Sequence, residues 1–204
     1  MEHVAAKKER MTPTDYLRSR FKGILDPIAR IFIRIGLMPN TMTILGLGGN
    51  TVGAYFLSQG QMTIGGLFIL AMGPVDALDG TMARLRGEAG NFGAFVDSVT
   101  DRYSELVIFG GLMIYYLQRG EWFSTILVYA AAAGSILVSY VRARGQSLGF
   151  DTKIGILTRM ERYLVLAPAL VLNFPIVGVW IIAILANLTA LQRILDIRRQ
   201  TRLP

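Results

Sequence analysis

The chain lacks cysteine altogether and has little histidine and little charge. Of its 204 residues, 17% are charged and 52% are hydrophobic, and the single histidine is His3. Without cysteine, neither a disulfide framework nor a thiolate metal site is possible. Because His3 lies in a polar N-terminal stretch, we expect it to take no part in catalysis.

Long polar stretches are also scarce. The apolar residues form long runs separated by short polar breaks, and the mean hydropathy is +0.45, which is typical of a chain that lives in a bilayer. No secretory signal peptide is expected, because residues 1–10 are polar and have no apolar core behind them. We therefore predict an all-α integral membrane protein, with six transmembrane helices preceded by an amphipathic interfacial helix.

The run of apolar and polar segments divides the chain into four parts. We predict a disordered tail at 1–12, an amphipathic juxtamembrane helix at 13–37, a six-helix transmembrane catalytic domain at 38–198 and a basic C-terminal tail at 199–204. In 13–37, apolar residues recur at helical spacing beside Arg30 and Arg34, which can reach headgroups; packing on another protein is the alternative. The six spans are predicted at 41–57, 62–84, 92–117, 122–142, 158–174 and 176–193.

Basic residues gather near one set of span ends. They lie in the N-terminal segment, around 84–86 and 142–162, and from 193 onward, whereas turns 58–61 and 173–175 carry none and Arg119 is the exception. The positive-inside rule then places both termini on the cytoplasmic side of the cell membrane. The net charge of +7 favours anionic headgroups and phosphate-bearing substrates, and no nucleic-acid-binding module accompanies it.

Four aspartates stand near the cytoplasmic ends of two predicted spans. Asp76 and Asp79 are three residues apart, and Asp97 and Asp101 are four apart, so each pair lies on one helix face and the pairs can face one another. An Asp at the centre of a membrane helix costs about 2.5–3.5 kcal/mol on insertion scales. Clustered acids without a cation would repel each other. The spacing favours a divalent metal site over acids that only cap helix ends.

The aspartates belong to a longer pattern. It runs Asp76, Asp79, Gly80, Ala83, Arg84, then Gly93, Asp97 and Asp101. At every fixed position this resembles the signature of the CDP-alcohol phosphotransferase (CDP-alcohol phosphatidyltransferase) family. The resemblance extends to Pro39, Asn40 and Thr43, to the six spans and to the amphipathic leader. It implies a CDP-linked lipid donor, an alcohol acceptor, CMP as leaving group and a homodimer.

The resemblance also implies roles for these residues. Asp76, Asp79 and Asp97 are the expected metal ligands, with Asp101 contributing to a second ion, either Mg²⁺ or Mn²⁺. Asp101 is the candidate general base for the acceptor hydroxyl. Gly80 and Gly93 leave room for the nucleotide, with close helix packing as the alternative. The expected contacts of the CDP moiety are Pro39, Asn40, Thr43, Asp76, Asp79, Gly80, Ala83, Arg84, Gly93 and Asp97. Asn40 or Thr41 is also expected to cap the first span.

Two further segments bear on the acceptor. The segment Ser139-Tyr140-Val141-Arg142-Ala143-Arg144 and the later Thr158-Arg159-Met160-Glu161-Arg162 resemble segments of phosphatidylinositol-phosphate synthases and their archaeal counterparts, in which a glutamate stands at the position of Thr158. We expect Arg142, Arg159 and Arg193, from three spans, to hold an acceptor phosphate; positive-inside anchoring is the alternative. Arg162 is grouped with them, or else pairs with Glu161 or Asp151.

The sequence therefore predicts a metal-dependent transferase of phospholipid biosynthesis, which moves a phosphatidyl group from CDP-diacylglycerol, or a related CDP-lipid, to inositol phosphate. Glycerol phosphate is the alternative acceptor, giving a phosphatidylglycerophosphate synthase. A small cation transporter is the alternative from another class, because intramembrane carboxylates also line ion pathways. Against it, the acids cluster at one membrane face.

Overall fold

The computed structural model describes residues 13–87, 90–152 and 154–202, and in this part of the chain it is entirely α-helical. The predicted tail, residues 1–12 with His3, lies outside the described residues. The helices are α1 (Pro13–Arg34), α2 (Pro39–Ser58), α3 (Met62–Arg86), α4 (Asn91–Gln118), α5 (Trp122–Ser147), α6 (Arg159–Val171) and α7 (Pro175–Gln200).

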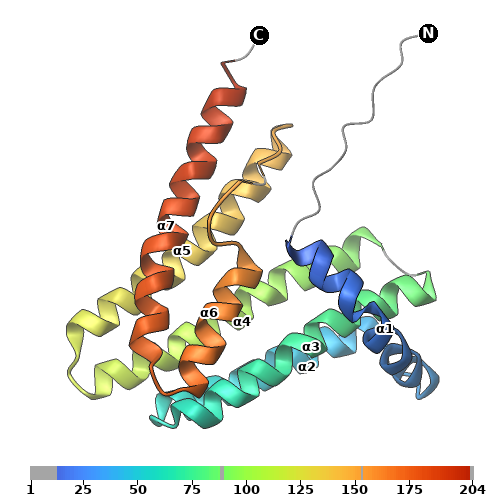
Figure 1. Ribbon diagram of the computed structural model, residues 1–204, viewed down its shortest axis with the longest axis horizontal. Coiled ribbons are helices and arrows are strands. Elements are labelled where there is room, and N and C mark those ends of the chain that lie inside the picture. The colour runs from blue at the N-terminus through green and yellow to red at the C-terminus, as the bar shows by residue number, and fades with distance from the viewer. Residues whose placement is uncertain (1–12, 88–89, 153, 203–204) are drawn as a thin grey trace.

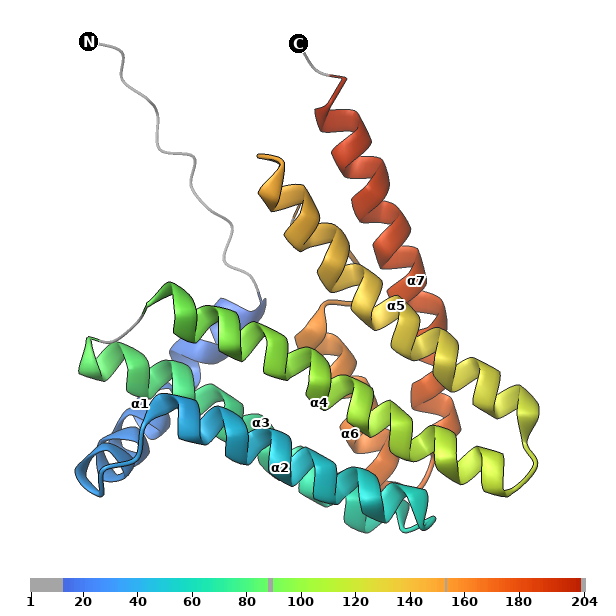
Figure 2. The same cartoon turned by 180° about the vertical axis from the view of Figure 1, so that it is seen from behind.

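The helices form two groups, which are joined through α6 and by the contact of α4 with α5 (Figures 1 and 2). In the first group α2 packs on both α3 and α4, and α1 packs on α3; in the second, α5 packs on α7. Helix α6 contacts α3 on one side and α7 on the other, while α4 contacts α5. Two contacts, that of the short helix α6 with α3 and α7 and that of α4 with α5, therefore connect the part of the chain that carries the aspartates with the part that carries Arg142 and Arg193.

The helix boundaries follow local sequence signals. Helix α2 begins at Pro39, with Met38 as the extended N-cap residue at φ −93° and ψ 151°. The prediction that Asn40 or Thr41 caps this helix is therefore wrong, because proline has a preset φ and no N–H, which suits the first helical position. Helix α3 ends where Gly87 adopts φ +70° and donates to the carbonyls of Ala83 and Arg84. Helix α7 continues to Gln200, two residues into the predicted C-terminal tail.

Three of the described helices, α3, α5 and α7, are long and apolar enough to cross a membrane. A fourth span is possible if residues Leu25–Arg34 and helix α2, which meet at 108°, count together. Helix α4 has 28 residues, but its first fifteen hold four charged residues: Asp97, Asp101, Arg102 and Glu105. Helix α6 has 13 residues and is about 20 Å long, shorter than the ~30 Å hydrocarbon core. By length and composition, the described helices thus include three or four candidate spans, and the predicted six are not confirmed.

Small residues allow the helices to approach closely in the interior. A Cβ atom on Gly111 of α4 would lie 3.0 Å from the Cα of Ala54 in α2. On the other side of the molecule, the side-chain amide of Asn187 in α7 donates to the carbonyl of Ala130 in α5 at 3.0 Å. Since this amide is only partly exposed, the bond fixes the α5 and α7 pair in an apolar setting.

Gly111→Ala is expected to destabilise the protein by about 1–3 kcal/mol, because the added methyl overlaps the α2 backbone, which cannot move without shifting the helix. Gly110→Ala is the matched control, since a Cβ there meets nothing within 4 Å, and alanine favours helix. The thermal unfolding of both variants in detergent provides the measurement. Equal midpoints for the two variants would contradict the packing described.

Candidate functional site

The structure brings the two aspartate pairs together at the ends of α3 and α4. Asp76 and Asp79 lie in the last three turns of α3, and Asp97 and Asp101 in the first half of α4. The carboxylate of Asp97 lies within electrostatic range of Asp76, Asp79 and Asp101. The expectation that the pairs face one another is therefore met.

Arg159, the first residue of α6, connects the two pairs. Its Nη2 donates to Asp76 Oδ2 at 2.8 Å and lies 2.5 Å from Asp101 Oδ1. Arg102 adds a weaker ion pair, with Nη1 3.7 Å from Asp101 Oδ2. Among the described residues, no three carboxylate or imidazole groups stand close enough to hold a metal ion as they are. The guanidinium of Arg159 is thus the positive charge shared between one acid of each pair, and Arg102 adds a second positive charge at Asp101.

The predicted element at the start of α2 reaches the same place. Thr43 Oγ1 donates to Asp79 Oδ2 at 2.8 Å, in a buried hydrogen bond. The backbone N–H of Gly80 donates to the other oxygen of this carboxylate. Asp79 is 6% exposed, so two donors orient a carboxylate that water hardly reaches. The sequence analysis placed Thr43 and Asp79 in the same site but did not predict the hydrogen bond between them.

Open space lies on one side of the cluster and close packing on another. A Cβ on Gly46 of α2 would lie 2.6 Å from Asp76 Oδ1, whereas a Cβ on Gly93 would meet nothing within 4 Å. Close helix packing therefore does not explain Gly93. Among the other residues expected to contact CDP, Ala83 is half-buried and Arg84 is exposed. The Nη2 of Arg84 donates to Thr81 Oγ1 at 3.0 Å. Asn40 is exposed and Pro39 is half-buried.

The other predicted arginines lie farther along the same end of the molecule. Arg193 is 3% exposed, and its Nε and Nη1 donate to the carbonyls of Ile154 and Val138 at 2.9 and 2.7 Å. Arg142 is exposed at the end of α5. Both Arg142 and Arg162 lie within electrostatic range of Arg193. The positive charges of Arg142 and Arg162 thus act on Arg193, while Glu161 is a nearby negative charge that offsets part of their repulsion.

Arg162 has a partner that the sequence analysis missed. Its Nε and Nη2 donate to the two carboxylate oxygens of Glu105 at 2.8 and 3.0 Å, and Arg162 is 2% exposed. Glu105 lies one turn after Asp101 on α4, and that i+4 spacing was the available signal. Glu161, the partner considered for Arg162, instead accepts a hydrogen bond from the backbone N–H of Thr158 at 2.8 Å, in a capping box at the start of α6.

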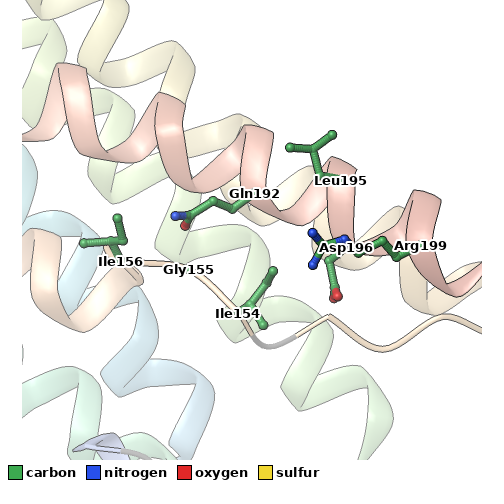
Figure 3. Close-up of a pocket in the computed structure, with 7 residues that line it drawn as sticks. All are labelled: Ile154, Gly155, Ile156, Gln192, Leu195, Asp196 and Arg199. Atoms are coloured by element: carbon green, nitrogen blue, oxygen red, sulfur yellow. The ribbon is translucent and has the colours of Figure 1, made fainter.

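A cavity of about 420 Å³ lies between the loop that precedes α6 and the last turns of α7 (Figure 3). Its wall combines apolar and polar side chains, and Ile154, whose carbonyl binds Arg193, belongs to it. The lining residues are Ile154, Gly155, Ile156, Gln192, Leu195, Asp196 and Arg199.

Glu105→Gln is expected to destabilise the protein by about 3–5 kcal/mol, because it leaves the buried Arg162 charge without a counter-ion. Replacing both residues by methionine should recover most of that loss. Glu121→Gln is the control, since the exposed pair of Arg119 and Glu121 contributes at most ~1 kcal/mol. Chemical unfolding in detergent measures all three variants; a Glu105→Gln protein as stable as Glu121→Gln would contradict a buried ion pair.

The sequence is similar to those of known proteins. A model of the CDP-alcohol phosphatidyltransferase family matches residues 36–191. The chain is 32% identical over 222 residues to the phosphatidylinositol phosphate synthase of Streptomyces avermitilis, covering 97% of this chain and 90% of that protein. It is 35% identical over 187 residues to the archaetidylinositol phosphate synthase of Pyrococcus horikoshii, covering 90% and 96%.

Solved structures agree with these relatives. The crystal structure of the Mycobacterium tuberculosis phosphatidylinositol phosphate synthase with CDP-DAG bound superposes with a TM-score of 0.80 and 29% identity, covering 85% of this chain and 93% of that one. The same synthase in complex with manganese and citrate gives a TM-score of 0.79. From the family model, the relatives and the aspartate site together, this chain belongs to the CDP-alcohol phosphatidyltransferase family.

Proposed function

We propose that this protein transfers a phosphatidyl group from CDP-diacylglycerol, or a related CDP-lipid, to inositol phosphate and releases CMP. One observation carries the proposal: Arg159, predicted to hold the acceptor phosphate, contacts Asp101, predicted to be the base, at 2.5 Å. An acceptor phosphate held by Arg159 would bring its hydroxyl close to that base. The relatives named as inositol-phosphate lipid synthases support the same acceptor.

The carboxylates fit a divalent metal by their chemistry. Asp76, Asp79, Asp97 and Asp101 supply only hard oxygen donors, which suit Mg²⁺ or Mn²⁺, and they gather at one place with Arg159 as counter-charge. We propose that these four residues hold the metal, and that four carboxylates suit two ions better than one. When bound, the metal neutralises the diphosphate and polarises its phosphorus. The complex of the tuberculosis enzyme with manganese supports this assignment.

The start of α2 and the ends of α3 and α4 are proposed to bind the CDP moiety. Thr43 keeps Asp79 oriented through its 2.8 Å hydrogen bond, and the open space at Gly93 admits the nucleotide. Arg84, which is exposed beside the cluster, offers charge-assisted hydrogen bonds to the diphosphate. The proposed contacts, besides the aspartates, are Pro39, Asn40, Thr43, Gly80, Ala83, Arg84 and Gly93.

In the proposed reaction, Asp101 takes the proton of the acceptor hydroxyl while the hydroxyl oxygen bonds to the lipid-bearing phosphorus. The bond between that phosphorus and the CMP oxygen breaks, and CMP leaves with the electron pair. Arg159, which is 40% exposed in its side chain, turns from the carboxylates to the acceptor phosphate.

Arg142 and Arg193 are proposed to complete the acceptor-phosphate site. The two carbonyl bonds of Arg193 use two of the five N–H donors of a guanidinium, so they orient it without exhausting it. We assign Arg162 a supporting part, because its bidentate bond to Glu105 holds the first turn of α6 against α4. Of the two arginines of α6, Arg159 is the more exposed and is proposed to face the substrate.

We further propose that six segments cross the membrane: α2 to α5, the stretch 158–174 that contains the 13-residue α6, and α7. Helix α1 is then proposed to lie along the cytoplasmic surface. The 108° angle between Leu25–Arg34 and α2 and the exposed Ile31 and Ile35 support this position of α1. On the opposite side, Arg119 donates to Glu121 at 2.9 Å, which raises the pKa of Arg119 and gives that exception to the positive-inside rule its own counter-ion. The homodimer stays a prediction.

The purified protein in lipid, with CDP-diacylglycerol and Mg²⁺, is expected to release CMP when inositol phosphate is supplied. Asp101→Asn should lower this rate at least ~100-fold, because a positioned base contributes roughly 10²–10⁴-fold. Glycerol phosphate, serine and free inositol are offered separately. Release with glycerol phosphate alone would replace the acceptor proposed here, and release with none would contradict the proposed reaction. EDTA should abolish the activity, and added Mn²⁺ or Mg²⁺ should restore it.

Gly46→Ala is expected to lower CMP release about tenfold or more, because the new methyl displaces the Asp76 carboxylate and a displacement near 1 Å can cost ~10² in rate. Gly48→Ala, on the same helix with nothing within 4 Å of its Cβ, is the matched control. The ratio of the two rates at saturating substrates is the measurement. Equal rates would show that Asp76 is free to move without consequence.

A further inference from the structure

Helices α3 and α6 pack antiparallel along their whole common length. Thr63 Oγ1 donates to the Val171 carbonyl at 3.0 Å near the start of α3, and Asp76, thirteen residues farther along α3, contacts Arg159 at the start of α6. Between these contacts, a Cβ on Gly66 would lie 2.7 Å from both Leu170 Cβ and the backbone nitrogen of Val171. Residues later in α3 therefore contact residues earlier in α6. The position of Arg159 therefore depends on the register of this helix pair.

Pro74 interrupts the hydrogen bonds of α3 two residues before Asp76. Proline has no N–H, so the carbonyl four residues earlier, that of Leu70, loses its helical donor. The hydroxyl of Tyr163 in α6 donates to this carbonyl oxygen at 2.7 Å. An unpaired carbonyl in an apolar environment is costly, and the phenol of Tyr163 supplies the missing partner.

Gly73 makes this contact possible. A Cβ atom there would overlap the hydroxyl oxygen of Tyr163 and would lie 2.6 Å from its Cζ. Gly73 and Pro74 thus act together. The absence of a side chain at Gly73 leaves room for the phenol of Tyr163, and the missing N–H of Pro74 leaves the Leu70 carbonyl available to accept its hydrogen bond. A side chain at position 73 would push Tyr163 away from α3.

Tyr163 and Arg159 are one helical turn apart, so they lie on the same face of α6. This face contacts α3 on both sides of Pro74: Tyr163 binds the Leu70 carbonyl before it, and Arg159 binds the Asp76 carboxylate after it. The direction in which α3 continues beyond Pro74 is thereby fixed relative to α6. Asp76 and Arg159 both lie in the region that this contact orients.

We propose that Tyr163 is a positioning residue for the transfer reaction: its hydroxyl supplies the hydrogen bond that Pro74 withholds from Leu70, and so holds Arg159 in register with Asp76 and Asp101. The proposal rests on the function proposed above insofar as Arg159 receives the acceptor phosphate. The contact between Tyr163 and Leu70 stands independently of that function and can be tested without it.

The first test is Tyr163→Phe, which removes only the hydroxyl. The KM for inositol phosphate should rise about 3- to 10-fold, the equivalent of one net hydrogen bond, while the KM for CDP-diacylglycerol changes less than ~2-fold, because the nucleotide residues lie on α2, α3 and α4. Tyr129→Phe, at a 64% exposed tyrosine of α5, is the control and should match the unaltered protein. An unchanged KM for inositol phosphate in Tyr163→Phe would overturn the positioning role.

The second test pairs Tyr163→Phe with Pro74→Ala, which returns an N–H to the Leu70 carbonyl. In the Pro74→Ala protein, the loss of the Tyr163 hydroxyl should raise the KM for inositol phosphate by less than ~2-fold, because the helix now satisfies the carbonyl itself. A loss of the same size in both backgrounds would refute the link between Tyr163 and Pro74.

Thermal unfolding of the same four proteins separates this proposal from the proposed function. Tyr163→Phe should lower the unfolding midpoint clearly in the Pro74 protein and less in the Pro74→Ala protein, whether or not inositol phosphate is the acceptor. If CMP release fails with inositol phosphate but this pattern of midpoints holds, the proposed function is wrong and the α3 to α6 contact is right. If Tyr163→Phe lowers both midpoints equally or neither, the contact is wrong.

Discussion

The interaction on which the rest of the site depends is the contact of one guanidinium with two carboxylates from different helices. Arg159 lies 2.8 Å from Asp76 and 2.5 Å from Asp101, within a group of four acids. Like charges near a bilayer cannot stay together without a cation. The fold therefore has to deliver a positive charge to the meeting point of α3 and α4, and the short helix α6 does so with its first residue.

Burial separates the arginines that support the site from the one that can exchange partners. Arg162 is 2% exposed, and its Nε and Nη2 both donate to Glu105, so moving it would leave a partly buried carboxylate uncompensated. The Arg159 side chain keeps 40% of its surface exposed, so its charge can move at a smaller desolvation cost. Two arginines three residues apart thus have different roles, because Arg162 is buried against Glu105 and the Arg159 side chain is partly exposed.

Much of this arrangement follows from local sequence. Helix boundaries were predicted within a few residues for most helices, because apolar runs end at charged or turn residues. The i+3 and i+4 spacings of the aspartates also fix the helix face on which each pair lies. What sequence did not give is which helices meet. Glu105 and Arg162 are 57 residues apart, and Leu70 and Tyr163 are 93 apart. Pro74 indicates that the Leu70 carbonyl lacks its helical donor, but the sequence does not show that Tyr163 supplies the hydrogen bond instead. The length of α6 was overestimated because the apolar residues beyond Val171 form a turn.

The most direct test of the account is anomalous X-ray scattering from crystals of the protein grown with Mn²⁺ and CDP. If the acids are a metal site for which Arg159 is the counter-charge, manganese peaks will lie among Asp76, Asp79, Asp97 and Asp101, and the Arg159 guanidinium will have left the Asp76 and Asp101 carboxylates. Crystals that contain bound CDP but show no manganese peak at the aspartates, with Arg159 still bridging Asp76 and Asp101, would contradict it.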